Sequence, residues 1–185
     1  GNIPVHAFNL ISPTFFANSS TGNKYSLWVN VYGVSERYLN VYGEKDLRAQ
    51  MNQFFHRTYT HPVDGTTLDM KMLCNWYWYD ETAILETGKG TKDWNFYRYA
   101  ETLLSAAEAI AQSSGVNAEA AGYLAQVKAR ANMEGKDVST IASELQRLGK
   151  QAFIEECWKE RLREFPLEMK IWDDCVRTGK FPQIS

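Results

Sequence analysis

The stretch RYAETLLSAAEAIAQ, residues 98–112, decides the fold of this chain. Its apolar side chains recur at steps of three and four residues, the spacing that places them on one face of an α-helix. The helix-ending sequence Ser113-Ser114-Gly115 follows, so we predict a helix over residues 96–112. The residues on its apolar face are Tyr99, Leu103, Ala106 or Ala107, and Ile110.

The helical period continues to the end of the chain. A second helix begins near Asn117 and is expected to pair antiparallel with the first. A third begins at the expected cap Ser139 and runs through Leu162, until Pro166 breaks it. A last short helix over residues 167–176 ends at Thr178-Gly179. The apolar face of the second helix is Ala121, Leu124, Val127 or Lys128, and Ala131.

Turn-forming residues dominate the sequence before Trp94. β-Branched and aromatic residues over 25–34 favour a short strand or extended segment, and residues 44–55 predict a brief helix. We expect the rest to be irregular loop held by its own aromatic side chains. The sequence thus predicts a loop-rich, aromatic-rich, ligand-facing segment over 1–93 and a helical segment over 94–185, which together form one domain.

Composition excludes several classes of protein. The chain has 185 residues, a net charge of -2 and interspersed charges, so it offers no concentrated positive field for nucleic acid. No run approaches the ~20 apolar residues of a membrane-spanning helix. The three cysteines match no zinc pattern, and two of them, Cys157 and Cys175, fall in helical patterns typical of small buried hydrophobic residues.

Three motifs, in order, resemble one family. Residues 98–109 resemble the helix that SusD/RagB proteins write as R-Y-A-E-x-L-L-x-x-A-E-A. Residues 127–131 are similar to the family's V-R-x-R-A, and residues 160–180 to its E-R-x-x-E-F-x-x-E-x-x-R-W-x-D-L-x-R-T-G. The resemblance covers about residues 93–180, and the departures from it are Lys128, Met169, Ile171 and Cys175.

The resemblance implies a mainly α-helical, SusD-like fold, with helical hairpins, a long irregular loop region and few short strands. It also implies a non-enzymatic receptor that captures oligosaccharide, or in some relatives peptide, at the bacterial cell surface. Such a receptor delivers its ligand to a SusC-like, TonB-dependent outer-membrane transporter. Relatives are lipid-anchored at the outer membrane and carry an N-terminal half of helical repeats, so the resemblance implies that this chain is a C-terminal fragment of such a protein or a shortened relative, with the lipid anchor in the full-length form. No cofactor, metal or catalytic residue is implied.

Aromatic clusters supply the candidate ligand residues, because flat apolar rings stack on the C–H faces of sugar rings while polar neighbours bind hydroxyls. In an extended segment Trp76 and Trp78 would share one face, with Tyr77 and Tyr79 on the other. One pair would belong to the core and the other to a platform, unless all four are packing residues. The candidates in this cluster are Asn75, Trp76, Trp78 and Asp80.

A second aromatic cluster lies earlier in the chain. In the family, aromatic residues that stack on ligand come from loops well upstream of the R-Y-A-E helix, which is where this cluster falls. Its candidate ligand residues are Trp28, Tyr32 and Tyr38; Tyr25 and Tyr42 lie nearby, and Ser35, Arg37 and Asn40 are available for hydroxyls.

The charged motif residues are better interpreted as structural, since paired charges at helical spacing usually serve packing. Glu101 and Glu108 are seven residues apart on one face, so Arg130 of the next helix is expected to pair with them. The charged motif residues later in the sequence are expected to connect the last helices through ion pairs. The full set is Arg98, Glu101, Glu108, Arg130, Glu160, Arg161, Glu164, Glu168, Asp174 and Arg177.

The sequence contains few residues or motifs that point to another function. A glycoside hydrolase needs two carboxylates across a cleft, and no motif singles out Asp80, Glu81 or Glu86. For a nucleophilic triad, the sequence contains no Gly-x-Ser-x-Gly motif and offers only three histidines as the base. Residues 88–91 do not match the motif of a phosphate-binding loop. The alternatives left open are a peptide-binding module or a module that docks on a transporter without touching sugar and, third, a glycoside hydrolase. A metal site of His56 and His61 with Asp64 also stays open. The triad's histidines would be His6, His56 or His61.

Overall fold

The computed structural model describes residues 34–77, 79–82, 93, 95–166 and 168–180. The chain divides into two compact units. The strand unit consists of Gly1–Asn40 and Arg48–Trp94, and the helical unit of Val41–Leu47 and Asn95–Ser185. The described residues form mainly helices and one two-stranded sheet, which confirms the predicted fold class.

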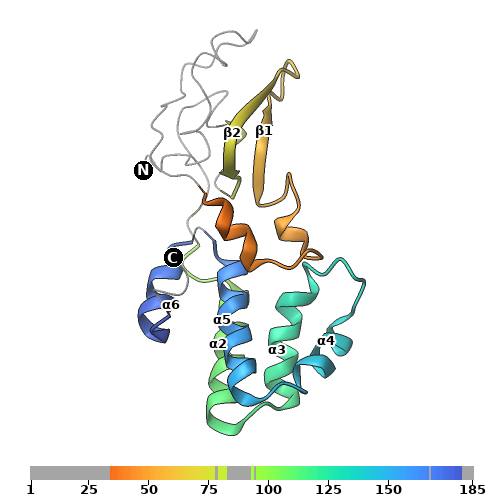
Figure 1. Cartoon of the computed structure of the whole chain (residues 1–185), viewed down its shortest axis with the longest axis vertical. Helices are drawn as coiled ribbons and strands as arrows, with labels where there is room; N and C mark the ends of the chain where they lie inside the picture. Colours follow the sequence, from red (N-terminus) through yellow and green to blue (C-terminus); the bar gives the residue numbers. More distant parts are fainter. Residues whose placement is uncertain (1–33, 78, 83–92, 94, 167, 181–185) are drawn as a thin grey trace. The chain divides into compact units, whose positions relative to one another are not determined.

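The helical unit is built on an antiparallel pair, α2 (Tyr99–Ser114) and α3 (Ala118–Ala129), as the sequence predicted (Figure 1). Gly115 ends α2 at a φ of 83°, a conformation that favours glycine. Asn117 then caps α3, because its side-chain oxygen accepts a hydrogen bond from the Ala120 N–H at 2.9 Å.

The predicted third helix is in fact two helices, α4 (Val138–Leu145) and α5 (Lys150–Glu164). Asp137, and not Ser139, caps α4, accepting from the Thr140 N–H at 2.8 Å. The chain leaves the helical conformation at Gly149, whose ψ of 155° is extended, and this separates the two helices. Pro166 lies beyond the end of α5, as predicted.

The last helix, α6 (Ile171–Thr178), lies four residues later than predicted at its start. It ends at Gly179 in the left-handed conformation with φ 66°, so the Thr178-Gly179 stop is confirmed. Its buried residues are Asp174 and Cys175, one charged and one small, so α6 contributes little to the apolar core.

The core of the helical unit lies between α2, α3, α4 and α5. Alanines line the α2–α3 contact and are fully buried there, which lets the two backbones approach closely. Cys157 is also fully buried, and burial raises the pKa of its thiol to about 12, so it serves as a small apolar residue. The fully buried core residues are Leu104, Ala107, Ala111, Ala120, Ala121, Leu124, Ala125, Phe153 and Cys157.

The described part of the strand unit contains a hairpin of β1 (Phe55–Thr60) and β2 (Thr67–Asn75), paired antiparallel. Phe55 faces Asn75 and His56 faces Cys74, and a bulge then shifts the register before Thr58 pairs with Asp69. The hairpin was not predicted. Residues 25–33 of the predicted strand lie outside the described residues.

The predicted helix over residues 44–55 is wrong. Within this range the structure has one short 3-10 helix, η3 (Leu47–Ala49), and β1 already begins at Phe55; another 3-10 helix, η2 (Glu36–Val41), ends before the range begins. The Leu47 N–H donates to the Ala131 carbonyl at 2.8 Å, so it is not available for a bond within a helix. Asn52 has a φ of 64°, which also interrupts a helix.

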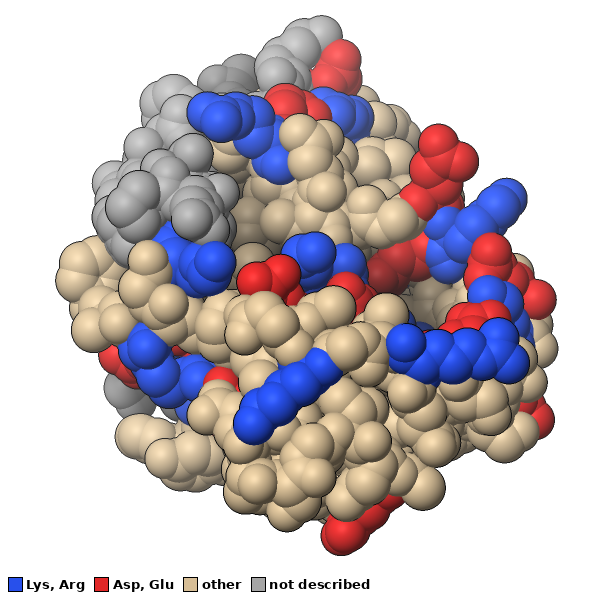
Figure 2. Space-filling view, turned by 60° about the horizontal axis from the view of Figure 1, so that its bottom comes forward, with Lys and Arg blue, Asp and Glu red and all other residues tan. Residues whose placement is uncertain are grey.

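The surface shown in Figure 2 carries Lys and Arg side chains interspersed with Asp and Glu. A surface of this kind lacks the continuous positive field that nucleic acid requires. Among the helices of the described residues, none is both long enough and apolar enough to cross a membrane.

Candidate functional site

Three aromatic rings stack at the end of the hairpin in the strand unit. The Trp76 ring lies 4.1 Å from His56 and 4.8 Å from Tyr79, centroid to centroid, and each pair is within 14° of parallel. We call His56, Trp76 and Tyr79 the ring stack. All three side chains are half-buried, so part of the stack faces solvent. A partly exposed stack of this kind is a surface on which a sugar ring can pack.

Backbone geometry brings these rings together. The Trp76 N–H donates to the Phe54 carbonyl at 2.8 Å, which extends the hairpin pairing by one residue and places Trp76 near His56. The Tyr79 N–H then donates to the Trp76 carbonyl at 3.0 Å, closing a turn. The segment is therefore not extended, and the expected separation of Trp76 and Tyr79 onto opposite faces is wrong.

Asn75 lies directly before the ring stack and is 8% exposed. Its side-chain oxygen accepts a hydrogen bond from the Tyr77 N–H at 2.8 Å. Its amide nitrogen, Nδ2, has no hydrogen-bond partner within the described part of the chain. A buried donor without a partner carries a free-energy cost.

Acidic groups follow the ring stack in sequence. The Tyr79 hydroxyl donates to Glu81 Oε2 at 3.2 Å, while Asp80 is half-buried and Glu81 exposed. Burial, and then the neighbouring Tyr59, raise the pKa of Tyr79, so its hydroxyl stays protonated and can donate. Burial also lowers the pKa of His56, which favours the neutral imidazole.

The remaining predicted ligand residues are more dispersed. Trp28, Tyr32 and Trp78 lie outside the described residues. Tyr38 is half-buried and packs edge-on against Phe55, with ring centroids 6.4 Å apart. Tyr42, in the helical unit, is buried, and its hydroxyl donates to the Arg163 carbonyl at 3.0 Å.

The histidines are used in other ways than a metal site requires. His61 is fully buried at the hairpin turn, where its Nδ1 accepts from the Val63 and Asp64 N–H groups at 3.2 and 3.4 Å. His56 stacks on Trp76. Over the described ranges, no group of three or more His, Cys, Asp or Glu side chains could hold a metal ion.

The charged motif residues meet in the helical unit. Arg98 forms a two-pronged pair with Glu168, at 2.7 and 2.6 Å, and also donates to Glu164 at 2.9 Å. Arg130 donates to the same Glu164 oxygen at 2.7 Å. The expected pairing of Arg130 with Glu101 and Glu108 is therefore wrong, because α3 directs this side chain to α5 and not to α2.

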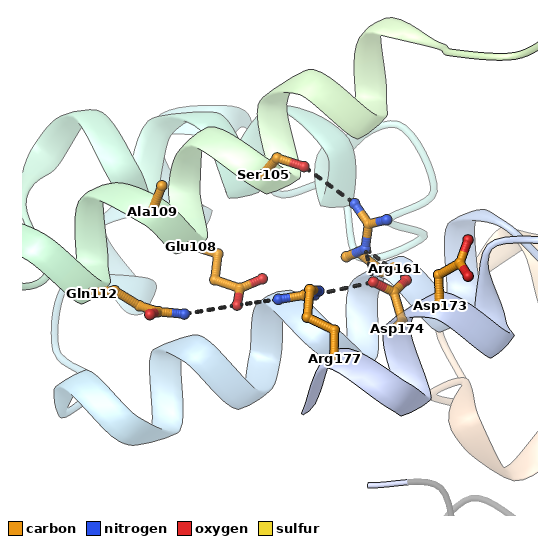
Figure 3. A pocket seen from close by; sticks show the side chains of 8 residues that line it. All are labelled: Ser105, Glu108, Ala109, Gln112, Arg161, Asp173, Asp174 and Arg177. Carbon is orange, nitrogen blue, oxygen red and sulfur yellow. Dashed lines mark hydrogen bonds and ion pairs between the residues drawn. The ribbon is translucent and has the colours of Figure 1, made fainter. Parts of the chain in front are cut away.

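A second group surrounds Arg161, whose exposure is only 7%. Its Nε donates to both oxygens of Asp174, at 2.8 and 2.7 Å, and Nη2 donates to Glu101 at 3.2 Å. Nη1 reaches the Ser105 hydroxyl at 3.3 Å. One guanidinium thus connects α5 to both α2 and α6 (Figure 3).

A third group of interacting polar side chains surrounds Glu108. Its Oε1 accepts from Gln112 at 2.9 Å, Trp158 at 2.9 Å and Arg177 at 2.6 Å. Arg177 also donates to Asp174 at 3.0 Å, which completes a chain of contacts across the hollow in Figure 3. Separately, Glu160 is fully buried and pairs with Arg163 at 3.1 Å.

The hollow between α2 and α6 has a volume of about 460 Å³. Its charged groups bond mainly to one another, so they hold the helices together instead of facing a ligand. The ring stack with Asn75 is therefore the stronger candidate site. The residues that line the hollow are Ser105, Glu108, Ala109, Gln112, Arg161, Asp173, Asp174 and Arg177.

Sequence reasoning named Asn75, Trp76 and Asp80 but missed His56 as a member of the site. The available signal was the pair of turn-bounded segments around His61-Pro62 and Asp64-Gly65, which predicts a hairpin. The bulge that shifts the register and places His56 across from Cys74 is seen only in the structure.

Comparison with models of protein families identifies one family. A model described as the SusD family matches residues 17–183. The chain is also similar to a solved structure of a SusD superfamily protein from Parabacteroides distasonis, with a TM-score of 0.71 and 24% identity. That likeness covers 92% of this chain but 35% of the other, so this chain spans about a third of that protein's length. No curated protein matches the chain.

Replacing Arg161 with Met should lower the free energy of unfolding by about 3 kcal/mol or more, because Asp174 and Glu101 stay buried without that partner. Urea denaturation followed by circular dichroism measures this loss. The matched control is Arg57→Met, which removes an equally close pair with Glu36, at 2.7 Å, on the exposed surface. This control should change stability little. Equal losses in the two variants would contradict the buried role of Arg161.

Acid should weaken the contact of α3 with α5 at Glu156. Burial alone raises the pKa of this carboxyl, but the charges of Lys128 and Arg163 outweigh burial, and the pKa lies below its ordinary 4.5. The ionised carboxylate therefore stabilises the fold above about pH 4.5, and this stabilisation is lost as the pH falls through the lowered pKa.

The stability difference between the wild type and Glu156→Gln should consequently be largest near neutral pH and shrink below pH 4.5. Urea denaturation at several pH values tests this. Glu155→Gln is the control, since the Glu155 carboxylate accepts from the Gln151 amide at 3.1 Å. A difference that does not depend on pH would disprove the assignment.

Proposed function

Because the chain belongs to the SusD family, we propose that it binds nutrient for polysaccharide utilisation by capturing oligosaccharide at the ring stack. The observation that carries the proposal is the partly exposed stack of Trp76 on His56 and Tyr79. Aromatic faces bind the C–H faces of sugar rings without any covalent chemistry. The proposed function is therefore capture without catalysis.

Polar groups beside the stack supply hydrogen bonds for sugar hydroxyls. Tyr79 offers a hydroxyl, and Glu81 offers a carboxylate that accepts from it at 3.2 Å. Donors and acceptors flanking an apolar surface are the combination that a hydroxyl-rich ligand requires. In this proposal the strand unit carries the ligand site, and the helical unit is a scaffold stabilised by its ion pairs.

The expected partner is a SusC-like, TonB-dependent transporter, and the expected location is the outer-membrane surface, reached through a lipid anchor. One feature supports a docking role. Trp172 and Val176 lie four residues apart on α6, so they share a face, and each is 64% exposed. An exposed apolar face of this kind is typical of a protein contact.

Glycan capture is tested by calorimetry against malto-, cello- and mannohexaose. At least one hexasaccharide should bind, and Trp76→Ala should weaken that binding at least about tenfold, because the shared ring of the stack is lost. Trp76→Tyr, which keeps an aromatic ring, should retain most of the affinity. Circular dichroism of each variant checks the fold. Binding that is unaffected by Trp76→Ala would overturn the proposed site.

Docking is tested by surface plasmon resonance with the detergent-solubilised SusC-like transporter of the same source. Trp172→Ser with Val176→Ser should weaken capture about tenfold or more while leaving glycan binding unchanged. The control Val63→Ser changes an apolar side chain that is 59% exposed in the strand unit. Equal capture by the double variant and the control would remove α6 from the contact.

A further inference from the structure

The middle ring of the ring stack is covered on both of its faces. The rings of His56 and Tyr79 are each inclined by 14° to Trp76, with centroids 4.1 and 4.8 Å from that of the indole. Stacked planes are about 3.5 Å apart, so each centroid is displaced only a little sideways. Two rings with such small displacements would overlap if they shared one face of Trp76. His56 therefore lies on one face of the indole and Tyr79 on the other.

This arrangement leaves the two end rings as the ones with a face turned away from the stack. A sugar ring packs on a flat aromatic face, and both faces of Trp76 are already in contact with protein rings. The sugar must therefore pack on the outer face of His56 or on that of Tyr79. Trp76 then acts as a positioning residue that holds the end rings parallel.

The Tyr79 end of the stack adjoins the interior of the strand unit. Tyr59, which is 2% exposed, approaches Tyr79 at 6.1 Å and Trp76 at 5.8 Å, centroid to centroid. Burial raises the pKa of Tyr79, and its hydroxyl already donates to Glu81. The imidazole of His56, by contrast, stacks on Trp76 and makes no other ring contact in the described part of the chain. His56 is therefore the end ring that lies away from the buried Tyr59.

Strand pairing holds this imidazole in place before a ligand arrives. His56 belongs to β1, where it pairs with Cys74 of β2, and its side chain is half-buried. A ring that is already fixed by a paired strand and by stacking loses little conformational freedom on binding. The entropy cost of placing a sugar on it is correspondingly small.

The groups around His56 favour its neutral form. Burial lowers the pKa of His56 below its ordinary 6.5 and outweighs a hydrogen bond with the Gln53 backbone, which raises it. Across the hairpin the Cys74 thiol is uncharged, because burial raises its pKa to about 12. The next residue in β1, Arg57, is paired with Glu36 at 2.7 Å. A neutral imidazole presents an uncharged flat face, which suits the C–H face of a sugar.

We propose that the sugar ring packs on the outer face of the His56 imidazole, with Trp76 as the residue that positions it. This proposal rests on the proposed capture function and names the ring that the ligand contacts. A bound sugar excludes water from the imidazole, which penalises the charged form. Affinity should therefore be highest while His56 is neutral, and it should fall as the pH drops through the lowered pKa, below 6.5.

Calorimetry with the hexasaccharide that binds compares the wild type with His56→Leu and His56→Phe. At about pH 7.5, His56→Leu should bind about tenfold or more weakly, because the contact ring is lost. His56→Phe keeps a flat ring and should stay within about threefold of the wild type. Between about pH 7.5 and pH 5 the wild type should lose roughly threefold or more in affinity, whereas His56→Phe should change little. Circular dichroism of each variant checks the fold.

The control is Thr58→Ala, at an exposed position of the same strand, which should leave the affinity and its pH dependence unchanged. Tyr79→Leu tests the other end of the stack. A greater loss in Tyr79→Leu than in His56→Leu would place the sugar on Tyr79 and overturn this inference, while glycan capture would stand. Equal losses in His56→Leu and His56→Phe, or a pH dependence that His56→Phe shares with the wild type, would also overturn it. If the wild type binds no hexasaccharide, the capture function and the contact ring both fall.

Discussion

The helical unit depends on providing every buried charge with a partner. Arg161 is 7% exposed, and removing a guanidinium from water costs several kcal/mol unless ion pairs and hydrogen bonds replace the lost hydration. Asp174 on α6 and Glu101 on α2 supply that replacement from two different helices. Because these contacts depend on close geometry, α2, α5 and α6 are held in one relative arrangement.

This constraint explains how α6 can stay in place with an apolar face outward. Asp174 and Arg177 attach the helix through ion pairs, and Cys175 adds a small buried side chain. Trp172 and Val176 are therefore not needed for packing and remain exposed. An amphipathic helix normally buries its apolar face, so the reversed orientation is a property of the ion pairs.

The two units differ in how they use polar groups. In the helical unit Glu108 accepts three hydrogen bonds on one oxygen, and Arg161 donates to three different side chains. In the strand unit the three rings of the ring stack contact one another and stay half exposed. Ion pairs shared between helices stabilise a fold, whereas a partly open aromatic stack is suited to a ligand.

The sequence by itself determined the helices around residues 98–131 and the stops at Pro166 and Gly179, because helix periodicity and helix ends are set by neighbouring residues. It also indicated Asn75 and Trp76. Only the tertiary structure decided that Arg130 pairs with Glu164, and that Trp76 lies between His56 and Tyr79 in the stacking contacts. The physical reason is that such contacts depend on how helices pack and how a turn folds back, neither of which is encoded in local spacing. The same reason explains the failed helix at 44–55, where a backbone bond from Leu47 to distant Ala131 replaced local ones.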